Sequence, residues 1–475
     1  MTLPDGWEMV VGLEVHTELK TATKMFCGCA NHFGAQPNTN VCPVCLGLPG
    51  SLPVLNVRAV ELAMAIGIAL HSTIAASTFH RKNYFYPDMP KDFQISQYDL
   101  PINKGGYLDL PDGSRVSIER AHLEEDTGKS THLGGTGRIH GADRSLVDYN
   151  RSGVPLVEIV SGPDIRSSAQ ARSYASSLRA ILIATGASDG RMEEGSMRID
   201  ANVSVRKPNA PFGTRCEIKN LNSLRSLQRA IDFEALRQIE LIESGGTVRQ
   251  ETRHWDENVG ATSTMRTKEE AEDYRYFREP DLVELVPSDE WQGRVRDALG
   301  PMPAERRLLL ISRLSSPSET QLDAVEVVID LGLEDYVHAA LDAGADASLA
   351  LARAANELAA GLDLLSNVTF TAFSSTLLLE QSGTLSATQS KTVLGELLKS
   401  GGDPASIATS LGFEQMSSES LASTVALLID ENPDEWERFR DGDEKLAQFF
   451  IGQVMKQTKG QANGKDVIKE LHARR

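Results

Sequence analysis

The sequence lacks an apolar run long enough to cross a membrane. Its longest apolar stretch, Val57 to Leu70, is interrupted by Arg58 and Glu61, whereas a spanning helix needs about 20 apolar residues. The N-terminus also lacks a basic segment followed by an apolar run, so we expect no signal peptide. We therefore expect a cytoplasmic protein without membrane contact. Its 475 residues should form two to four domains of roughly 100 to 200 residues each.

Positive charge is scarce overall. The 48 Lys and Arg residues against 66 Asp and Glu residues give a net charge of −18. This argues against broad coating of a nucleic acid, because phosphate contacts supply most nonspecific affinity. The segment 452–475 differs, since its six basic and two acidic residues favour local phosphate contacts. A solvated helical face is the alternative. The basic residues are Lys456, Lys459, Lys465, Lys469, Arg474 and Arg475.

Cysteine is also rare, and four of the five cysteines lie in one short segment. Cys27 and Cys29 are separated by one residue, and Cys42 and Cys45 by two. This spacing in a cytosolic chain predicts a structural zinc site, because four thiolates on two tight turns can converge on one ion. Four free thiols in a small core are the alternative. We expect Cys216 to pack as a small apolar residue.

Helical spacing dominates after Pro303, whereas the first 290 or so residues mix short alternating runs with a few helices. Prolines between residues 280 and 303 mark this boundary, as expected of a connection between domains. A weaker break lies at 400–404. We predict early helices, each with a capping residue or a glycine stop, over 56–70, 168–185 and 223–244.

Three strand-like segments place charged side chains on one face. Alternation puts Glu14, His16 and Glu18 on one face of 13–19 and apolar residues on the other. Two further segments, joined by a predicted hairpin around 207–214, carry similar polar faces. These faces consist of Arg198, Asp200, Asn202, Ser204 and Arg206, and of Arg215, Glu217 and Lys219.

Such faces occur most often on a solvated antiparallel sheet. The alternative is a sheet that holds Mg²⁺ and phosphate, because magnesium binds a few carboxylates together with phosphate oxygens and water. The acidic run 124–126 adds candidate ligands. Arg198 and Lys219 would lie close enough to neutralise phosphate charge.

The run Gly128-Lys129-Ser130 is not the end of a P-loop. The position five before Gly128 is Leu123, where the motif requires glycine. The acidic residues before it would also repel phosphates. There is no Rossmann glycine fingerprint. ATP would therefore bind on a sheet face, through metal and basic side chains.

Several long runs allow comparison with known families: VGLEVHTELKT, KMFCGC, CPVCLGLPG, RKNYFYPDMPKDFQISQYD, HLEEDTGKSTH, VDYNRSGVPLVEIVSGPDIRS, EEGSMRIDANVSVR, EIKNLNS, QETRHWDE and DYRYF. They resemble the B subunits of aspartyl/glutamyl-tRNA amidotransferases, the GatB family. The resemblance spans Val11 to about Leu285, and FFIGQVMKQTKGQAN is similar to the family's tail. These motifs are too long and specific to agree by chance.

The resemblance implies an α+β fold in three parts. Residues 1–295 would form a zinc-containing cradle domain, built on an antiparallel sheet with flanking helices. Residues 296–403 would form an all-α domain, and residues 404–475 a small helical tail domain that contacts tRNA.

The resemblance also implies a reaction. The γ-phosphoryl group of ATP passes to the side-chain carboxylate of misacylated Glu-tRNA(Gln), Asp-tRNA(Asn) or both, and ammonia then attacks the acyl phosphate. Positioning and charge neutralisation carry most of such a transfer. The chain contains no amidase signature, so a separate amidase subunit, GatA, and a small subunit, GatC, are implied as partners.

The motifs imply particular roles for residues of this sequence. The residues expected at the reaction centre are Glu14, His16, Glu124, Glu125, Asp200 and Glu217. Mg²⁺ is expected on Glu14, His16, Glu125, Asp200 and Glu217. ATP or tRNA is expected on Arg81, Lys82, Arg198, Lys219, Lys456 and Lys459. Arg81 and Lys82 precede the aromatic run 84–86, which suits a nucleotide or the acceptor end of tRNA, with core aromatics as the alternative.

Two other functions remain open from the sequence. A noncatalytic tRNA-binding scaffold would leave the sheet-face carboxylates dispensable. A self-contained ATP-dependent ligase acting on a small molecule would need ammonia but no tRNA, although the long tail argues against it.

Overall fold

The computed structural model describes residues 3–134, 142–267, 274–413, 418–458, 462 and 464–475. The chain divides into two compact units, Met1–Ala304 and Glu305–Arg475. The first is a mixed α/β unit and the second is helical, so the predicted fold class is confirmed.

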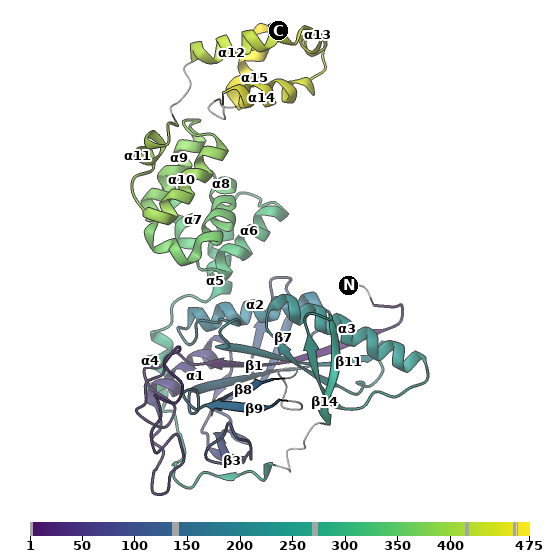
Figure 1. Cartoon of the computed structure of the whole chain (residues 1–475), viewed down its shortest axis with the longest axis vertical. Helices are drawn as coiled ribbons and strands as arrows, with labels where there is room; N and C mark the ends of the chain where they lie inside the picture. Colours follow the sequence, from purple (N-terminus) through teal and green to yellow (C-terminus); the bar gives the residue numbers. More distant parts are fainter. Residues whose placement is uncertain (1–2, 135–141, 268–273, 414–417, 459–461, 463) are drawn as a thin grey trace. The chain divides into compact units, whose positions relative to one another are not determined.

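The first unit is built on one large sheet (Figure 1) with the strand order β14-β13-β12-β11-β1-β10-β7-β4-β3-β15, and β8 and β9 form a separate hairpin. Neighbouring strands on this path are antiparallel, except that β12 and β13 are parallel. The strands are β1 (Glu8–Glu18), β2 (Thr73–Ile74), β3 (His80–Asn83), β4 (Phe93–Ser96), β5 (Asn103–Lys104), β6 (Tyr107–Asp109), β7 (Arg115–Glu125), β8 (Lys129–Leu133), β9 (Arg144–Asp148), β10 (Pro155–Ser161), β11 (Met197–Arg206), β12 (Cys216–Leu221), β13 (Glu251–Asp256), β14 (Ala261–Thr267) and β15 (Phe277–Arg278).

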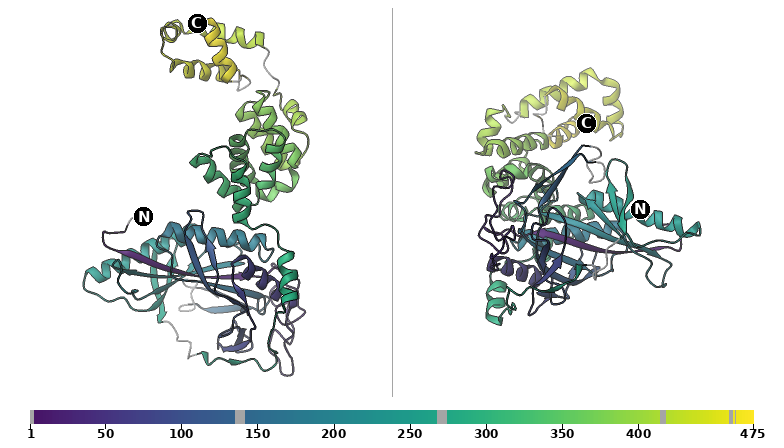
Figure 2. Two further views of the ribbon diagram at one scale, coloured as in Figure 1. Left: turned by 180° about the vertical axis from the view of Figure 1, so that it is seen from behind. Right: turned by 60° about the horizontal axis from the view of Figure 1, so that its bottom comes forward.

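Three α-helices in the described part of this unit match the predicted ones. They are α1 (Val57–Ala69), α2 (Ser168–Ala184) and α3 (Leu224–Glu243), and α4 (Asp289–Asp297) follows. The side chains of Asn56, Ser167 and Ser223 cap the first three by accepting backbone N–H groups of the first turn. Helices α2 and α3 lie side by side over one face of the sheet (Figures 1 and 2).

The two faces of the central strands differ as alternation predicts. Leu13 and Val15 of β1 are fully buried in the core shared with α2 and α3, whereas Glu14 and His16 lie on the opposite face. The predicted hairpin is confirmed, because β11 pairs antiparallel with β12. Lys129 lies in β8 rather than in a loop before a helix, so the rejection of a P-loop is confirmed.

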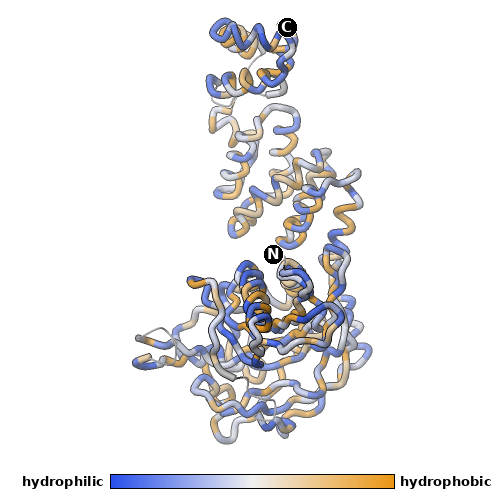
Figure 3. The backbone as a smooth tube through the Cα atoms, turned by 90° about the vertical axis from the view of Figure 1, so that its right-hand side faces the viewer, coloured by the Kyte–Doolittle hydropathy of each residue, from blue (hydrophilic) through white to orange (hydrophobic). Residues whose placement is uncertain are grey.

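The second unit consists of helices whose hydrophobic and hydrophilic residues alternate along the chain (Figure 3), as expected of amphipathic helices. They are α5 (Pro303–Ser312), α6 (Glu319–Asp330), α7 (Glu334–Asp342), α8 (Ala347–Arg353), η2 (Ala354–Leu358), η3 (Ala359–Asn367), α9 (Phe370–Gln381), α10 (Ala387–Ser400), α11 (Pro404–Ser410), α12 (Ser418–Glu431), α13 (Pro433–Arg440), α14 (Leu446–Gln457) and α15 (Gly464–Arg474).

Two separate cores stabilise these helices. The first extends from Leu310 to Ala408 and the second from Leu421 to Leu471. Because α11 packs on α9 and α10, the first core continues past the break that the sequence indicates at 400–404. No helix in the described part of the chain is both long and apolar enough for a membrane span.

Candidate active site

A row of charged and histidine side chains crosses the four central strands on the face opposite α2 and α3. The strand register pairs His16 of β1 with Arg198 of β11 on one side and with Glu158 of β10 on the other. Glu158 in turn faces His122 of β7. Because directly opposed residues of antiparallel strands share a face, these four side chains lie in one line.

More polar residues follow on the same face, further along β1 and β11 and on the neighbouring β12. Glu14 of β1 faces Asp200 of β11, and Asn202 faces Glu217 of β12. The Asn202 amide donates a hydrogen bond to Oε1 of Glu14 at 2.9 Å. The sequence predicted this polar face, and the structure brings its residues together.

The charged and histidine residues of both sets line one cavity with a volume of about 990 Å³. Its lining contains both carboxylates and cations, which suits a substrate with several charges. The cationic residues are Lys82, Arg120, Arg198 and Lys219, and the aromatic residues are Tyr84, Tyr98, Tyr274 and Tyr276.

His16, Glu124 and Glu158 form the tightest group in the cavity. Nε2 of His16 lies 3.7 Å from Oε1 of Glu124 and 3.4 Å from Oε2 of Glu158. One ligand atom from each residue lies within 4.8 Å of the others. Two carboxylates and an imidazole are a suitable donor set for a divalent cation, with the carboxylates supplying the oxygen ligands that Mg²⁺ takes.

The pKa values of His16 and Glu124 depend on the charges of the other residues in this group. Burial alone would lower the pKa of His16, but the hydrogen bond and charge of Glu158, with the charges of Glu124 and Asp200, raise it to about 9. Burial and the charge of Glu158 raise the pKa of Glu124. Without a metal ion, the His16 imidazolium therefore occupies the centre of the group.

His122 has the opposite character. Burial, reinforced by the charges of Arg120 and His16, lowers the pKa of His122 to about 4 despite the nearby carboxylate of Glu158. Its Nε2 lies 3.6 Å from Oε2 of Glu158. Among the described residues, Nδ1 of His122 and Nε of Arg198 are buried without a hydrogen-bond partner, so water or a ligand can satisfy them.

At the β12 end of the cavity, Lys219 joins two carboxylates. Its Nζ lies 2.5 Å from Oδ2 of Asp200 and 3.4 Å from Oε1 of Glu217. Burial would lower the pKa of Lys219, but the charges of these carboxylates raise it. Thr252 also donates a hydrogen bond to Oε2 of Glu217 at 2.8 Å.

Arg198 is held by Asp126. The sequence indicated Asp126 only as part of the acidic run 124–126, with no role of its own. Oδ2 of Asp126 lies 2.7 Å from a terminal nitrogen of Arg198 and 3.4 Å from Nε of Arg151. These charges keep the pKa of Asp126 low despite its burial. Burial and the charge of Asp126 raise the pKa of the neighbouring Glu18 to about 7.

Two predicted residues of the first unit lie outside the cavity. Glu125 follows Glu124 on β7 and therefore faces the other side of the sheet, where Lys91 binds its carboxylate and the backbone N–H of Ile95 donates to it. Arg81 binds Glu279 with two hydrogen bonds, at 2.6 and 2.8 Å. Neither residue joins the group around His16.

Glu158 is the main site residue that the sequence reasoning missed. It is the single charged residue in the strand Pro155–Ser161, whose other side chains are apolar or small. A lone carboxylate in a buried strand is the signal that could have identified it, because such a group must be paired or bind a cation.

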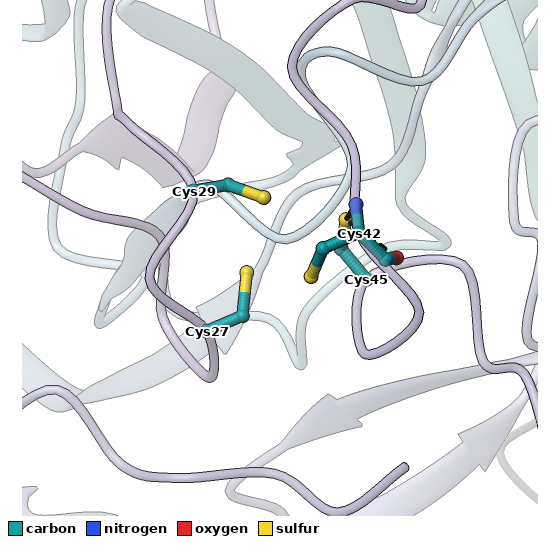
Figure 4. Close-up of side chains that lie close together, drawn as sticks. All are labelled: Cys27, Cys29, Cys42 and Cys45. Atoms are coloured by element: carbon teal, nitrogen blue, oxygen red, sulfur yellow. Dashed lines mark hydrogen bonds between the residues drawn. The ribbon is translucent and has the colours of Figure 1, made fainter.

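The predicted cysteine cluster is assembled in the structure. Cys27 and Cys29 lie on one loop and face Cys42 and Cys45 on another (Figure 4), and their sulfur atoms all lie within 4.8 Å of one another. Zinc bound to four thiolates requires sulfur atoms about 3.8 Å apart, given Zn–S bonds of about 2.3 Å. The cluster is thus compatible with a structural zinc ion. Cys216 is fully buried, as predicted.

The predicted cations near the C-terminus are only partly in the described region. Lys456 is exposed on α14, whereas Lys459 lies outside the described residues. Arg474 pairs with Glu470 at 2.7 Å, and Arg475 pairs with Glu444.

Two family models match the chain. The model described as the GatB/GatE catalytic domain matches residues 9–293, and the model described as the GatB domain matches residues 335–474. The first match contains every residue that lines the cavity. It defines the class of this unit, which is a catalytic domain of the GatB/GatE type.

Relatives of similar length agree. The B subunit of the aspartyl/glutamyl-tRNA(Asn/Gln) amidotransferase of Frankia casuarinae is 48% identical over 485 residues, covering 98% of this chain and 95% of the relative. The protein of the same name from Nocardia farcinica is 48% identical over 476 residues, covering 96% and 94%. That from Thermoanaerobacter sp. is 45% identical over 470 residues, covering 96% and 97%. The chain therefore belongs to the family of amidotransferase B subunits, which confirms the resemblance.

Proposed function

We propose that the cavity activates the side-chain carboxylate of a glutamate or aspartate esterified to tRNA. The γ-phosphoryl group of ATP passes to a carboxylate oxygen, which releases ADP. Ammonia attacks the resulting acyl phosphate, phosphate leaves, and the side-chain amide forms. The observation that carries this proposal is the group of His16, Glu124 and Glu158 in a cation-lined cavity of a catalytic-type domain.

In this proposal His16, Glu124 and Glu158 hold Mg²⁺. When bound, the ion would neutralise the charge that develops on the transferring phosphoryl group. Glu14, Asp200 and Glu217 lie beside this group, and Lys219 limits the repulsion between their charges.

The cavity's arginines and lysines have a separate role. Lys82, Arg120 and Arg198 cannot coordinate a cation, so we assign them to phosphate oxygens. The contact with Asp126 orients Arg198 before substrate arrives, which reduces the reorganisation needed during transfer.

The ammonia must come from elsewhere. Cys216 is fully buried beside Arg237 rather than placed in a cleft as a glutaminase nucleophile would be. We infer that a separate amidase subunit, GatA, releases ammonia from glutamine and that GatC completes the complex. Cys27, Cys29, Cys42 and Cys45 would hold one structural zinc ion.

The test is Glu158→Gln in the assembled complex, with Glu119→Gln as the matched control. Glu119 is exposed on the same strand as Glu124 and does not line the cavity. Its ion pair with Arg120, at 3.8 Å, is solvent-exposed and therefore contributes little. We expect Glu158→Gln to lower tRNA-dependent ADP formation and amidation by about 100-fold or more. Glutamine hydrolysis should persist, and added ammonia should not rescue amidation.

Glu119→Gln should behave as wild type in all three assays. If Glu158→Gln amidates at the wild-type rate with saturating Mg²⁺, the proposed metal group is wrong. A tRNA-binding scaffold, the alternative function, would in addition tolerate the loss of the other cavity carboxylates, Glu14, Glu124, Asp200 and Glu217.

A further inference from the structure

The structure contains a fully buried lysine beside the cysteine cluster. Lys24 has no exposed side-chain surface. A lysine is almost never buried in this way unless its charge is paired. The buried ammonium group of Lys24 therefore needs hydrogen-bond acceptors and a compensating negative charge nearby.

Lys24 has three partners. Its Nζ donates to the carbonyl oxygen of Asn40 at 2.9 Å and to that of Tyr149 at 3.4 Å. The third partner is Sγ of Cys45, at 3.8 Å. These contacts use all three donors of an ammonium group.

Only the sulfur can carry a compensating negative charge. Within the part of the chain that the structure describes, no carboxylate lies in ion-pair range of Lys24. The nearby Glu125 is bound by Lys91 instead. A neutral thiol would leave the buried ammonium uncompensated, whereas a thiolate would balance it.

Four thiolates around one divalent ion carry a net charge of −2. Such a charge is costly in a buried setting unless cations or N–H donors surround it. Here the backbone N–H of Cys42 donates to Sγ of Cys45 at 3.1 Å, and Lys24 supplies the positive charge on the same sulfur.

We propose that Lys24 is the charge-balancing residue of a metal–thiolate centre formed by Cys27, Cys29, Cys42 and Cys45. It acts through Cys45 and does not coordinate the ion. Its contact with Tyr149 also joins the centre to the loop that carries Arg151, which reaches Asp126 at the wall of the cavity. Lys24 thus stabilises the metal centre and also helps to hold the loop that supports the cavity wall.

The first test compares zinc retention in full-length variants. Lys24→Met keeps an unbranched side chain only one atom shorter but removes the charge and the donors, whereas Lys24→Gln keeps donors without the charge. Lys20→Met is the matched control, because Lys20 lies four residues before Lys24, just after β1, and its side chain is exposed. Zinc content is measured by elemental analysis, and zinc release is followed with a coloured chelator.

We expect wild type and Lys20→Met to carry about one zinc per chain and to release it slowly. Both Lys24 variants should release zinc about 10 to 100 times faster, as is usual for loss of an outer partner of a metal ligand. Release at the wild-type rate from either folded Lys24 variant would overturn the proposal. So would wild-type protein without zinc and with four titrating thiols.

A second measurement needs no variant. In the zinc-loaded wild-type chain, an amine-acetylating reagent should modify Lys20 but not Lys24, as read by peptide mass spectrometry. After chelation, Lys24 should become reactive. Modification of Lys24 at the rate of Lys20 in the zinc-loaded chain would contradict the proposal, and so would unchanged protection of Lys24 after zinc is removed.

Discussion

At the scale of single residues, one lysine limits repulsion among the carboxylates at the β12 end of the cavity. Lys219 contacts Asp200 and Glu217 directly, and Glu14 is close enough to influence its pKa. Removing this cation leaves three carboxylates without a neutralising charge in the cavity that we propose for ATP. Their mutual repulsion and their repulsion of phosphate would then both oppose binding.

Lys219→Met should therefore lower amidation by about 100-fold and raise the concentration of ATP needed for half-maximal rate. Steady-state kinetics of the assembled complex, with ATP and Mg²⁺ varied separately, measure both effects. Lys20→Met, which changes an exposed charge outside the cavity, should have no effect. Wild-type kinetics for Lys219→Met would contradict this role of Lys219 in binding and catalysis.

At the scale of elements, α3 is held to the sheet by a buried ionic network. Glu234 of α3 has no exposed surface and accepts hydrogen bonds from Arg237 and from Thr262 of β14. Its carboxylate also lies 3.2 Å from Nε of Arg253 in β13. This network fixes the helix over the strands at one end of the sheet.

Glu234→Gln should lower the free energy of unfolding of the first unit by about 3 kcal/mol at pH 7, because it removes the negative charge that faces the buried Arg253 and the half-buried Arg237. Burial would raise the pKa of Glu234, but the hydrogen bonds from Arg237 and Gln238 hold it below its ordinary value of 4.5. The carboxylate therefore stabilises the fold above about pH 4.5, and this contribution disappears as pH falls through the lower pKa of the folded state.

Calorimetry of wild type and Glu234→Gln between pH 3 and pH 7 measures this difference directly. The gap in melting temperature should be constant above about pH 5 and should shrink below about pH 4.5. A gap that is independent of pH would mean that shape, rather than charge, holds the helix.

The difference between patterns within one strand and pairing between strands explains which parts of the site could be predicted from the sequence. Alternation is a local property, so it correctly placed Glu14 and His16 on one face of β1. The position of Glu158 depends on the pairing of β10 with β1 and β7, and such long-range register is not encoded in any one strand. For the same reason the run 124–126 predicted acidic ligands but not which neighbour would face the cavity.

At the scale of the whole molecule, the last four helices have their own core. Lys456 and Lys469 are exposed there, whereas Arg474 and Arg475 are paired with carboxylates. Fewer cations are thus available for phosphate than the composition indicates. We propose that this tail contacts tRNA through a few phosphates while the cavity carries the chemistry.

Ending the chain after Phe413 should therefore raise the KM for tRNA and leave ATP-dependent transfer at saturating tRNA close to wild type. The salt dependence of tRNA binding should also flatten, by about one unit of slope for each phosphate that the tail neutralises in the full-length chain. Filter binding across a tenfold range of salt measures this slope. Equal affinity and equal slope for the two forms would exclude the tail from tRNA binding.

Transfer of the γ-phosphoryl group to the side-chain carboxylate can be followed directly with an oxygen isotope. The assembled complex is given Glu-tRNA labelled with ¹⁸O in the side-chain carboxylate, together with unlabelled ATP, Mg²⁺ and ammonia. The released phosphate is then analysed by mass spectrometry. Transfer to the carboxylate predicts one ¹⁸O atom in each phosphate formed, because the acyl phosphate breaks between carbon and the labelled oxygen. Phosphate without ¹⁸O, formed while amidation proceeds, would contradict the account.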